Sequence, residues 1–184
     1  SSSLLFPYEK GKPSKINKLA FSVYSAAAII YLLRKQRDAV GLSLFSNEVE
    51  FHSQARLSSV HIDLLYNQLA NLLLQEQVQV HKKTNTVDEL HMIAENIHKR
   101  YLVILFSDLI EQESTDELFE ALQHLKYNKH EVLLYHVTDH RQEREFNFRN
   151  QPYRFVDLET GDHIKFLPHD LKSNYQKAIS EYFE

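Results

Sequence analysis

The segment Tyr101-Leu-Val-Ile-Leu-Phe106 decides the fold, because it holds six apolar residues with no polar alternation. Such a run indicates a strand that is covered on both faces, as the strands of a parallel sheet are. The run ends abruptly at Ser107-Asp108, and the sequence then predicts a helix over residues 115–127 and a second apolar strand over 131–137. Helices and strands that alternate in this order predict an α/β fold.

The first part of the chain predicts one helix followed by a hairpin. Apolar residues recur at intervals of three and four from Lys15 to about residue 35, and Ser14 stands where a helix cap is expected. Short apolar runs follow over 39–45 and 49–52, separated by a polar break. These two runs predict a hairpin of two strands.

Two more helices are predicted between this hairpin and residue 101. Ser58 is placed to cap the first of them, which ends near residue 76. Thr86, with Glu89 three residues later, resembles a capping box that opens the second helix, which extends to about residue 100. The predicted core face of this second helix consists of Leu90, Ile93, Ala94 and Ile97.

The last part of the chain predicts another hairpin and a final helix. Strands over 153–158 and 163–166 flank Thr160-Gly161, which is a hairpin signal, and an amphipathic helix follows over 170–182. The sequence shows no internal repeat and no linker, so we expect a single domain over residues 1–184. Together the elements predict an α/β domain with a doubly wound, mostly parallel sheet flanked by helices.

The composition is that of a globular protein, with 43% hydrophobic and 25% charged residues. The formal charge of -4 provides no basic surface, so we expect no nucleic-acid partner. The chain contains no cysteine, which excludes disulfides, thiolate zinc sites and cysteine nucleophiles. The absence of cysteine leaves the compartment open and favours the cytoplasm. The longest apolar run, over 25–33, is too short for a membrane segment, and no signal peptide is visible.

Oxygen-bearing side chains at three places in the sequence form a candidate metal site. Asp108 follows the apolar strand, where open α/β sheets bind ligands; its alternative role is to cap the turn that follows. Ser1 and Ser3 belong to a hydroxyl run that is otherwise a solvated tail, and Thr84 lies before a helix whose cap is Thr86. Hydroxyl and carboxylate oxygens together are ligands that suit Mg²⁺ or Mn²⁺.

Several motifs give the chain a resemblance to a known bacterial family. They are Ser1-x-Ser3, Gly11-Lys-x-Ser-Lys15, Asp38-Ala-Val-Gly-Leu-x-Leu-Phe-Ser46, Leu102-Val-Ile-Leu-Phe-Ser-Asp108 and Asp157-Leu-Glu-Thr-Gly161. In this order and at these spacings they resemble the family called domain of unknown function 58, over essentially the whole chain. That family looks like a branch of the von Willebrand factor A-type, Rossmann-like fold. Members of that fold carry a metal-ion-dependent adhesion site, made of an Asp-x-Ser-x-Ser motif after the first strand, a threonine from a second loop and an aspartate from a third.

The resemblance implies a set of metal ligands in this chain. Ser1 and Ser3 match the two serines, Thr84 matches the threonine and Asp108 matches the last aspartate. The family's first aspartate would lie two residues before Ser1, and the first strand of the sheet would likewise lie outside this chain. Leu4 stands where the family often has methionine. With Asp108 as the only assigned carboxylate, we expect a weak or empty site for Mg²⁺ or Mn²⁺.

The favoured function is a non-enzymatic protein-interaction module, because the sequence shows no base beside a nucleophile and no phosphate-binding loop. His136 and His140 straddle a strand end, so their spacing does not place both on one face. The resemblance implies a MoxR-type AAA+ ATPase as the protein partner. Two alternatives stay open: a metal-assisted phosphoryl-transfer or hydrolytic enzyme that uses Asp108, and a degenerate domain that binds partners without metal. A group of acidic residues either begins a solvated helix or forms a rim that selects basic partners; it consists of Glu111, Glu113, Asp116 and Glu117.

Overall fold

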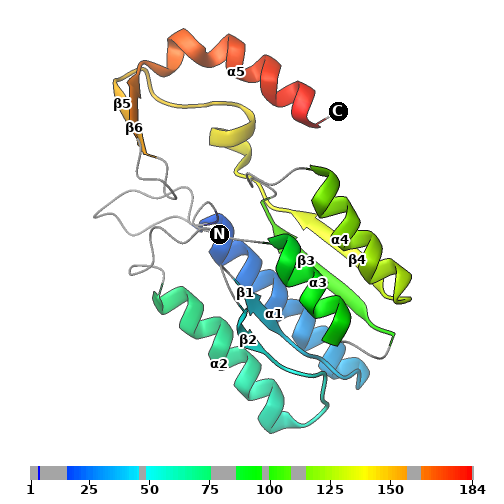
Figure 1. Ribbon diagram of the computed structural model, residues 1–184. Coiled ribbons are helices and arrows are strands. Elements are labelled where there is room, and N and C mark those ends of the chain that lie inside the picture. Colours follow the sequence, from blue (N-terminus) through cyan, green and yellow to red (C-terminus); the bar gives the residue numbers. More distant parts are fainter. Residues whose placement is uncertain are drawn as a thin grey trace.

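A computed structural model describes Leu4 and residues 16–45, 49–75, 86–96, 100–108, 115–156 and 163–183. In chain order the elements are α1 (Lys18–Gln36), β1 (Ser43–Phe45), β2 (Val49–His52), α2 (Ser59–Gln75), α3 (Thr86–Asn96), β3 (Leu102–Ser107), α4 (Thr115–Tyr127), β4 (Glu131–His136), the π-helical turn η2 (His140–Arg144), β5 (Tyr153–Val156), β6 (His163–Phe166) and α5 (Pro168–Phe183). Helices α3 and α4 lie side by side, whereas α5 and the β5–β6 hairpin lie apart from them (Figure 1). The architecture is mixed α/β.

The strand pairs confirm the central part of the sequence prediction. Strands β3 and β4 are parallel, in register from Leu102↔Glu131 to Ser107↔His136. Both predicted hairpins are present, since β1 pairs with β2 and β5 pairs with β6 in antiparallel fashion. Among the described residues each sheet has two strands, so these residues do not by themselves form one doubly wound sheet.

Helix α1 begins later than the sequence predicts. Its N-cap is Asn17, whose Oδ1 accepts a hydrogen bond of 2.7 Å from the backbone N–H of Ala20. The prediction that Ser14 caps this helix is therefore wrong; asparagine caps as well as serine does, and Asn17 is the residue next to the first helical turn. The helix ends at Gln36; the next residue, Arg37, is the C-cap, with a φ of 61° and a backbone N–H that donates to the carbonyl of Arg34.

Two hydrophobic cores hold the body of the molecule together. The first core lies between α1 and α2, and its buried members are Val23, Ile30, Val40, Ile62, Leu65 and Leu69. The second core joins α3 and α4 to β3, and its buried members are Leu90, Ala94, Leu105, Ala121 and Leu125. Leu90 and Ala94 confirm the predicted core face of α3; the side chain of Ile93 and the whole of Ile97 lie outside the described residues.

Strands β3 and β4 are covered on one face by described residues. Val103, Leu105 and Val132 pack in the second core beneath α3 and α4. Because side chains alternate along a strand, the opposite face carries Leu102 and Leu133, both of which are exposed. The prediction of a strand covered on both faces therefore holds for one face within the described part of the chain.

The end of the chain forms a small aromatic cluster. Phe146 lies at its centre, with its ring centroid 4.4 Å from that of Tyr175 on α5 and 6.4 Å from that of Phe166 on β6. Helix α5 begins at Pro168, two residues before the predicted start, and the turn over 157–162 lies outside the described residues. In the described part of the chain, no helix has the length and apolar character needed to cross a bilayer.

Candidate functional site

Asp108 lies directly after β3, at the carboxyl end of the strand, where α/β sheets bind their ligands. The strand is held against β4 up to this point, since the carbonyl of Ser107 accepts a 2.8 Å hydrogen bond from the N–H of Val137. Only 1% of Asp108 is exposed, so its carboxylate is enclosed by protein. An enclosed carboxylate needs partners for both of its oxygens, because an unpaired buried polar atom is costly.

The first partner of Asp108 is Lys18, from the first turn of α1. The Nζ atom of Lys18 donates to Oδ2 of Asp108 at 3.2 Å and to Oε1 of Glu143 at 2.6 Å. The side chain of Lys18 is 2% exposed, whereas that of Glu143 is 18% exposed. We call these three residues the Lys18 cluster. It joins α1, β3 and η2, which are far apart in the sequence.

Glu143 is positioned by the turn in which it lies. Its Oε2 accepts a 2.7 Å hydrogen bond from the N–H of Asp139, and Oδ1 of Asp139 accepts one of 2.7 Å from the N–H of Gln142. These reciprocal bonds have the pattern of a capping box, and they fix η2 at its start. The hydroxyl of Tyr175 donates to the backbone carbonyl of Glu143 at 2.6 Å. Burial raises the pKa of Tyr175 above its ordinary value of 10.0, and the negative charge of Glu143 raises it further.

The second oxygen of Asp108 is the unusual feature of the site. Oδ1 is buried and has no hydrogen-bond partner within the described part of the chain. Two carboxylates and one ammonium also leave the Lys18 cluster with a formal charge of -1. An unpaired carboxylate oxygen in a negatively charged, enclosed cluster favours a cation or a hydrogen-bond donor.

The structure places one of the four predicted metal ligands. Asp108 lies at the expected strand end, whereas Ser1, Ser3 and Thr84 lie outside the described residues. Among those described, no three histidine, cysteine, aspartate or glutamate side chains are grouped so as to hold a metal ion. The chemistry of Asp108 fits Mg²⁺ or Mn²⁺ through one free carboxylate oxygen, and the ammonium of Lys18 beside it weakens that fit.

Sequence reasoning missed Lys18 and Glu143. Lys18 carried a signal, since it stands at the start of a helix with a buried apolar stripe, four residues before the buried Ser22, whose hydroxyl donates to the Lys18 carbonyl at 2.9 Å. A lysine beside a buried stripe of a helix needs a counter-charge, which the sequence does not identify. Glu143 belongs to a run of charged residues that resembles a solvated surface, so no local signal sets it apart.

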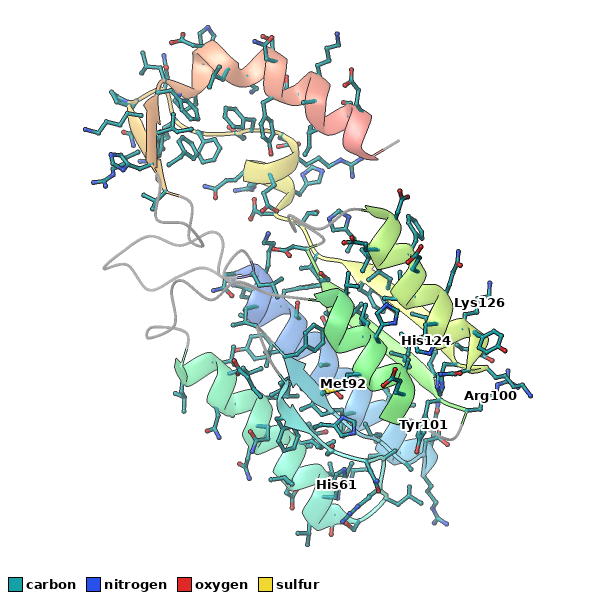
Figure 2. The ribbon with its side chains drawn as sticks, in the orientation of Figure 1. His61, Met92, Arg100, Tyr101, His124 and Lys126 are labelled. Carbon is teal, nitrogen blue, oxygen red and sulfur yellow. The ribbon has the colours of Figure 1, made fainter. Side chains whose placement is uncertain are left out.

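The histidines of the described region do not form a second site. The side chain of His124 extends from α4 toward α3 (Figure 2), where its Nδ1 lies 2.9 Å from Nδ1 of His91. The ring centroids are 5.2 Å apart, which fits a head-on hydrogen bond in which one nitrogen donates to the other. His140 is exposed, with its Nδ1 3.6 Å from Oε1 of Glu145. The pair His91 and His124 therefore joins two helices.

The described residues form a mixed α/β structure with a buried aspartate at the carboxyl end of a parallel strand. The family model described as "Protein of unknown function DUF58" matches residues 7–182, and the chain belongs to this family. The resemblance noted from the sequence motifs is thereby confirmed. No curated protein and no solved structure matches the chain.

Proposed function

We propose that the chain is a non-enzymatic protein-interaction module of the von Willebrand factor A type. Its recognition point is a weak Mg²⁺ or Mn²⁺ site in which Asp108 supplies the carboxylate and Ser1, Ser3 and Thr84 supply neutral oxygens. When bound, the cation provides a coordination position for an acidic group of the partner. Following the family resemblance, we further propose a MoxR-type AAA+ ATPase as the partner and the cytoplasm as the place of action.

One observation carries the proposal, namely that Oδ1 of Asp108 is buried and has no hydrogen-bond partner among the described residues. This oxygen is enclosed, it lies at the strand end where ligands of α/β sheets bind, and it belongs to a cluster with a charge of -1. Lys18 donates to the other oxygen, Oδ2, at 3.2 Å, so it orients the carboxylate.

The backbone of β3 supports the finer fold proposal, a doubly wound sheet. The carbonyls of Tyr101 and Ser107 accept hydrogen bonds from the N–H groups of Glu131 and Val137, so residues at every second position along β3 bond on the β4 side. The backbone groups of Leu102, Ile104 and Phe106 point to the opposite edge, where the described residues provide no ladder partner. A further strand along this edge would join β1–β2 and β3–β4 into one sheet, and would place Asp108 near the middle of its rim.

A titration with Mn²⁺, followed by electron paramagnetic resonance of the free ion, tests the metal site. We expect a dissociation constant weaker than about 0.1 mM for the wild-type chain, because one carboxylate serves the ion. Asp108→Asn should abolish this binding. Asp63→Asn, which changes an exposed aspartate of α2, is the matched control and should leave it unchanged. Equal binding by wild type and Asp108→Asn would refute the assignment of Asp108, and tight binding would refute the single-carboxylate site.

The contact between Lys18 and Asp108 favours a second candidate, a phosphoryl-accepting role for Asp108. A phosphoacceptor aspartate needs a nearby cation, and Lys18 supplies one at 3.2 Å. The 1% exposure of Asp108 opposes this role, since an attacking carboxylate needs access to its donor. Incubation with acetyl phosphate and Mg²⁺, followed by intact-mass measurement, separates the two. We expect no mass gain; a gain that Asp108→Asn removes would establish the second candidate.

A further inference from the structure

Helix α1 is apolar on two opposite faces. Its inner face packs in the first core through Val23 and Ile30, both buried. Its other face carries four large apolar side chains, each between 50% and 57% exposed. We call this set the outer stripe, and it consists of Phe21, Tyr24, Tyr31 and Leu32. A helix that is apolar all round is normally covered all round, so the outer stripe needs an explanation.

The spacing of the outer stripe makes it one continuous surface. Tyr24 lies three residues after Phe21, and Tyr31 and Leu32 lie seven and eight residues after Tyr24. These intervals place the four side chains along one face of the helix, with the small, exposed Ala28 between them. Large apolar side chains bury about 150–250 Å² each, so four that are half exposed present roughly 300–500 Å². A patch of that size is as large as the largest on a typical monomer, and such patches are frequently functional.

Charge differs between the two ends of the stripe. Arg34, Lys35 and Arg37 are exposed at its far end, and none forms an ion pair within the described part of the chain. Lys35 lies over the ring of Tyr31, with Nζ 4.8 Å from the centroid, so this cation adjoins the stripe itself. Asp38 is the acid that follows, which leaves this end with a formal charge of +2. At the near end, one turn before Phe21, Lys18 contacts Asp108.

We propose that the outer stripe of α1 binds an amphipathic helix of a partner protein, with apolar side chains on one face and acidic residues in the turn that meets Arg34 and Lys35. The stretch from Phe21 to Lys35 is about 21 Å long, which a partner helix of about 14 residues would span. The inference rests on the proposed interaction function and names the class of partner. In this proposal the partner helix lies along α1, beginning near Lys18 and Asp108 and ending near Lys35.

The same features distinguish this occupant from two others. A membrane surface favours basic residues along the whole polar border of an interfacial helix, whereas here the cations gather at one end of a chain with a net charge of -4. A second copy of α1 could cover the outer stripe with its own outer stripe, but it would not place acidic residues against Arg34 and Lys35. The charge of +2 at that end of the helix would then have no counter-charge. Charge complementarity therefore selects an acidic, apolar helix of a different protein.

The probe for the test is a fluorescein-labelled 16-residue peptide designed as an amphipathic helix, with leucine on one face and glutamate in its last turn. A second peptide carries lysine in that turn. Binding to the full chain is measured by fluorescence anisotropy. Phe21→Ser/Tyr31→Ser should weaken binding of the glutamate peptide at least tenfold. Leu74→Ser, which removes an exposed leucine of α2, is the matched control and should leave binding unchanged. Arg34→Glu/Lys35→Glu should weaken the glutamate peptide and strengthen the lysine peptide.

Several results would overturn the inference. They are the absence of saturable binding, equal binding by Phe21→Ser/Tyr31→Ser and wild type, and equal affinity for the two peptides. A dimer in sedimentation equilibrium that Phe21→Ser/Tyr31→Ser dissociates would assign the stripe to a second copy. Flotation with phosphatidylglycerol vesicles that the same variant loses would assign it to a membrane. Thermal melts check that each variant is folded. The Mn²⁺ titration is independent of these variants, so failure of the stripe and failure of the metal site are separate outcomes.

Discussion

Replacement of Lys18 by methionine provides the sharpest test of the buried cluster. Methionine keeps an unbranched side chain of nearly the same length but removes the ammonium that lies 3.2 Å from Asp108 and 2.6 Å from Glu143. The change leaves a fully enclosed carboxylate and a largely enclosed one without their cation. Removal of one partner from a buried ion pair typically costs about 3–5 kcal/mol in the free energy of unfolding. We expect a loss in that range.

The matched control is the exposed pair formed by Arg100 and Glu131. Its N···O distance is also 2.6 Å, but the two side chains are 71% and 65% exposed. Exposed pairs contribute at most about 1 kcal/mol, so Arg100→Met should change the stability little. The two variants therefore compare a buried lysine with an exposed arginine, each of which lies 2.6 Å from a glutamate oxygen.

Urea unfolding followed by circular dichroism measures both variants. With a slope near 2 kcal/mol per molar urea, a loss of about 3–5 kcal/mol lowers the midpoint by about 1.5–2.5 M. Addition of Asp108→Asn to Lys18→Met should recover part of the loss, because it removes one of the two uncompensated charges. The reasoning would be refuted if Lys18→Met and Arg100→Met cost the same, or if the double variant were less stable than Lys18→Met alone.

Three further predictions concern the frame around the site. Gly41→Ala should destabilise the fold by about 1–3 kcal/mol in urea unfolding, because a Cβ there would lie 2.5 Å from the carbonyl oxygen of Ser53; an unchanged midpoint would contradict the close approach. Asn17→Ala should cost about 1 kcal/mol through loss of the α1 cap, with Asn67→Ala on the exposed side of α2 as control. Tyr175 has a raised pKa in the folded state, so its contribution is present below pH 10.0 and is lost as pH rises through the folded pKa. Tyr175→Phe should therefore make thermal stability less dependent on pH above 10, and an identical dependence in both proteins would contradict this.

Local signals explain which elements the sequence predicts well. Helix α4 spans 115–127 as predicted, because acidic residues in its first turn and Lys126 in its last agree with the helix dipole and with the apolar period. Strands β3 and β4 are also predicted from local signals, since each is a short apolar run with polar residues at its end. The start of α1 was misplaced because Ser14 and Asn17 are both good caps, and local sequence alone does not choose between them.

The Lys18 cluster shows why the site was predicted only in part. Asp108 has a local signal, the end of an apolar strand. Lys18 is 90 residues away from it and Glu143 is 125 residues away from Lys18, and no period or motif links such distant positions. Their association is a property of the packing of α1 and η2 against the end of β3. The chemistry of the carboxylate could be anticipated, but the cation that occupies one of its oxygens could not.

The position of Lys18 sets stability and metal affinity against each other, and this gives the last prediction. The lysine stabilises the folded chain by pairing with Asp108, yet its charge opposes a dication at Oδ1. In Lys18→Met the cluster changes from a formal charge of -1 to -2, and neither oxygen of Asp108 keeps a hydrogen-bond partner among the described residues. The variant should bind Mn²⁺ at least about tenfold more tightly than wild type, a gain of about 1.4 kcal/mol.

Because a ligand that binds only the folded state stabilises it, Mn²⁺ should then raise the melting temperature of Lys18→Met more than that of wild type. A purely structural role for the cluster predicts the same loss of stability in Lys18→Met but no rescue by the ion, so an equal response of both proteins to Mn²⁺ would refute the metal site and leave the ion pair intact.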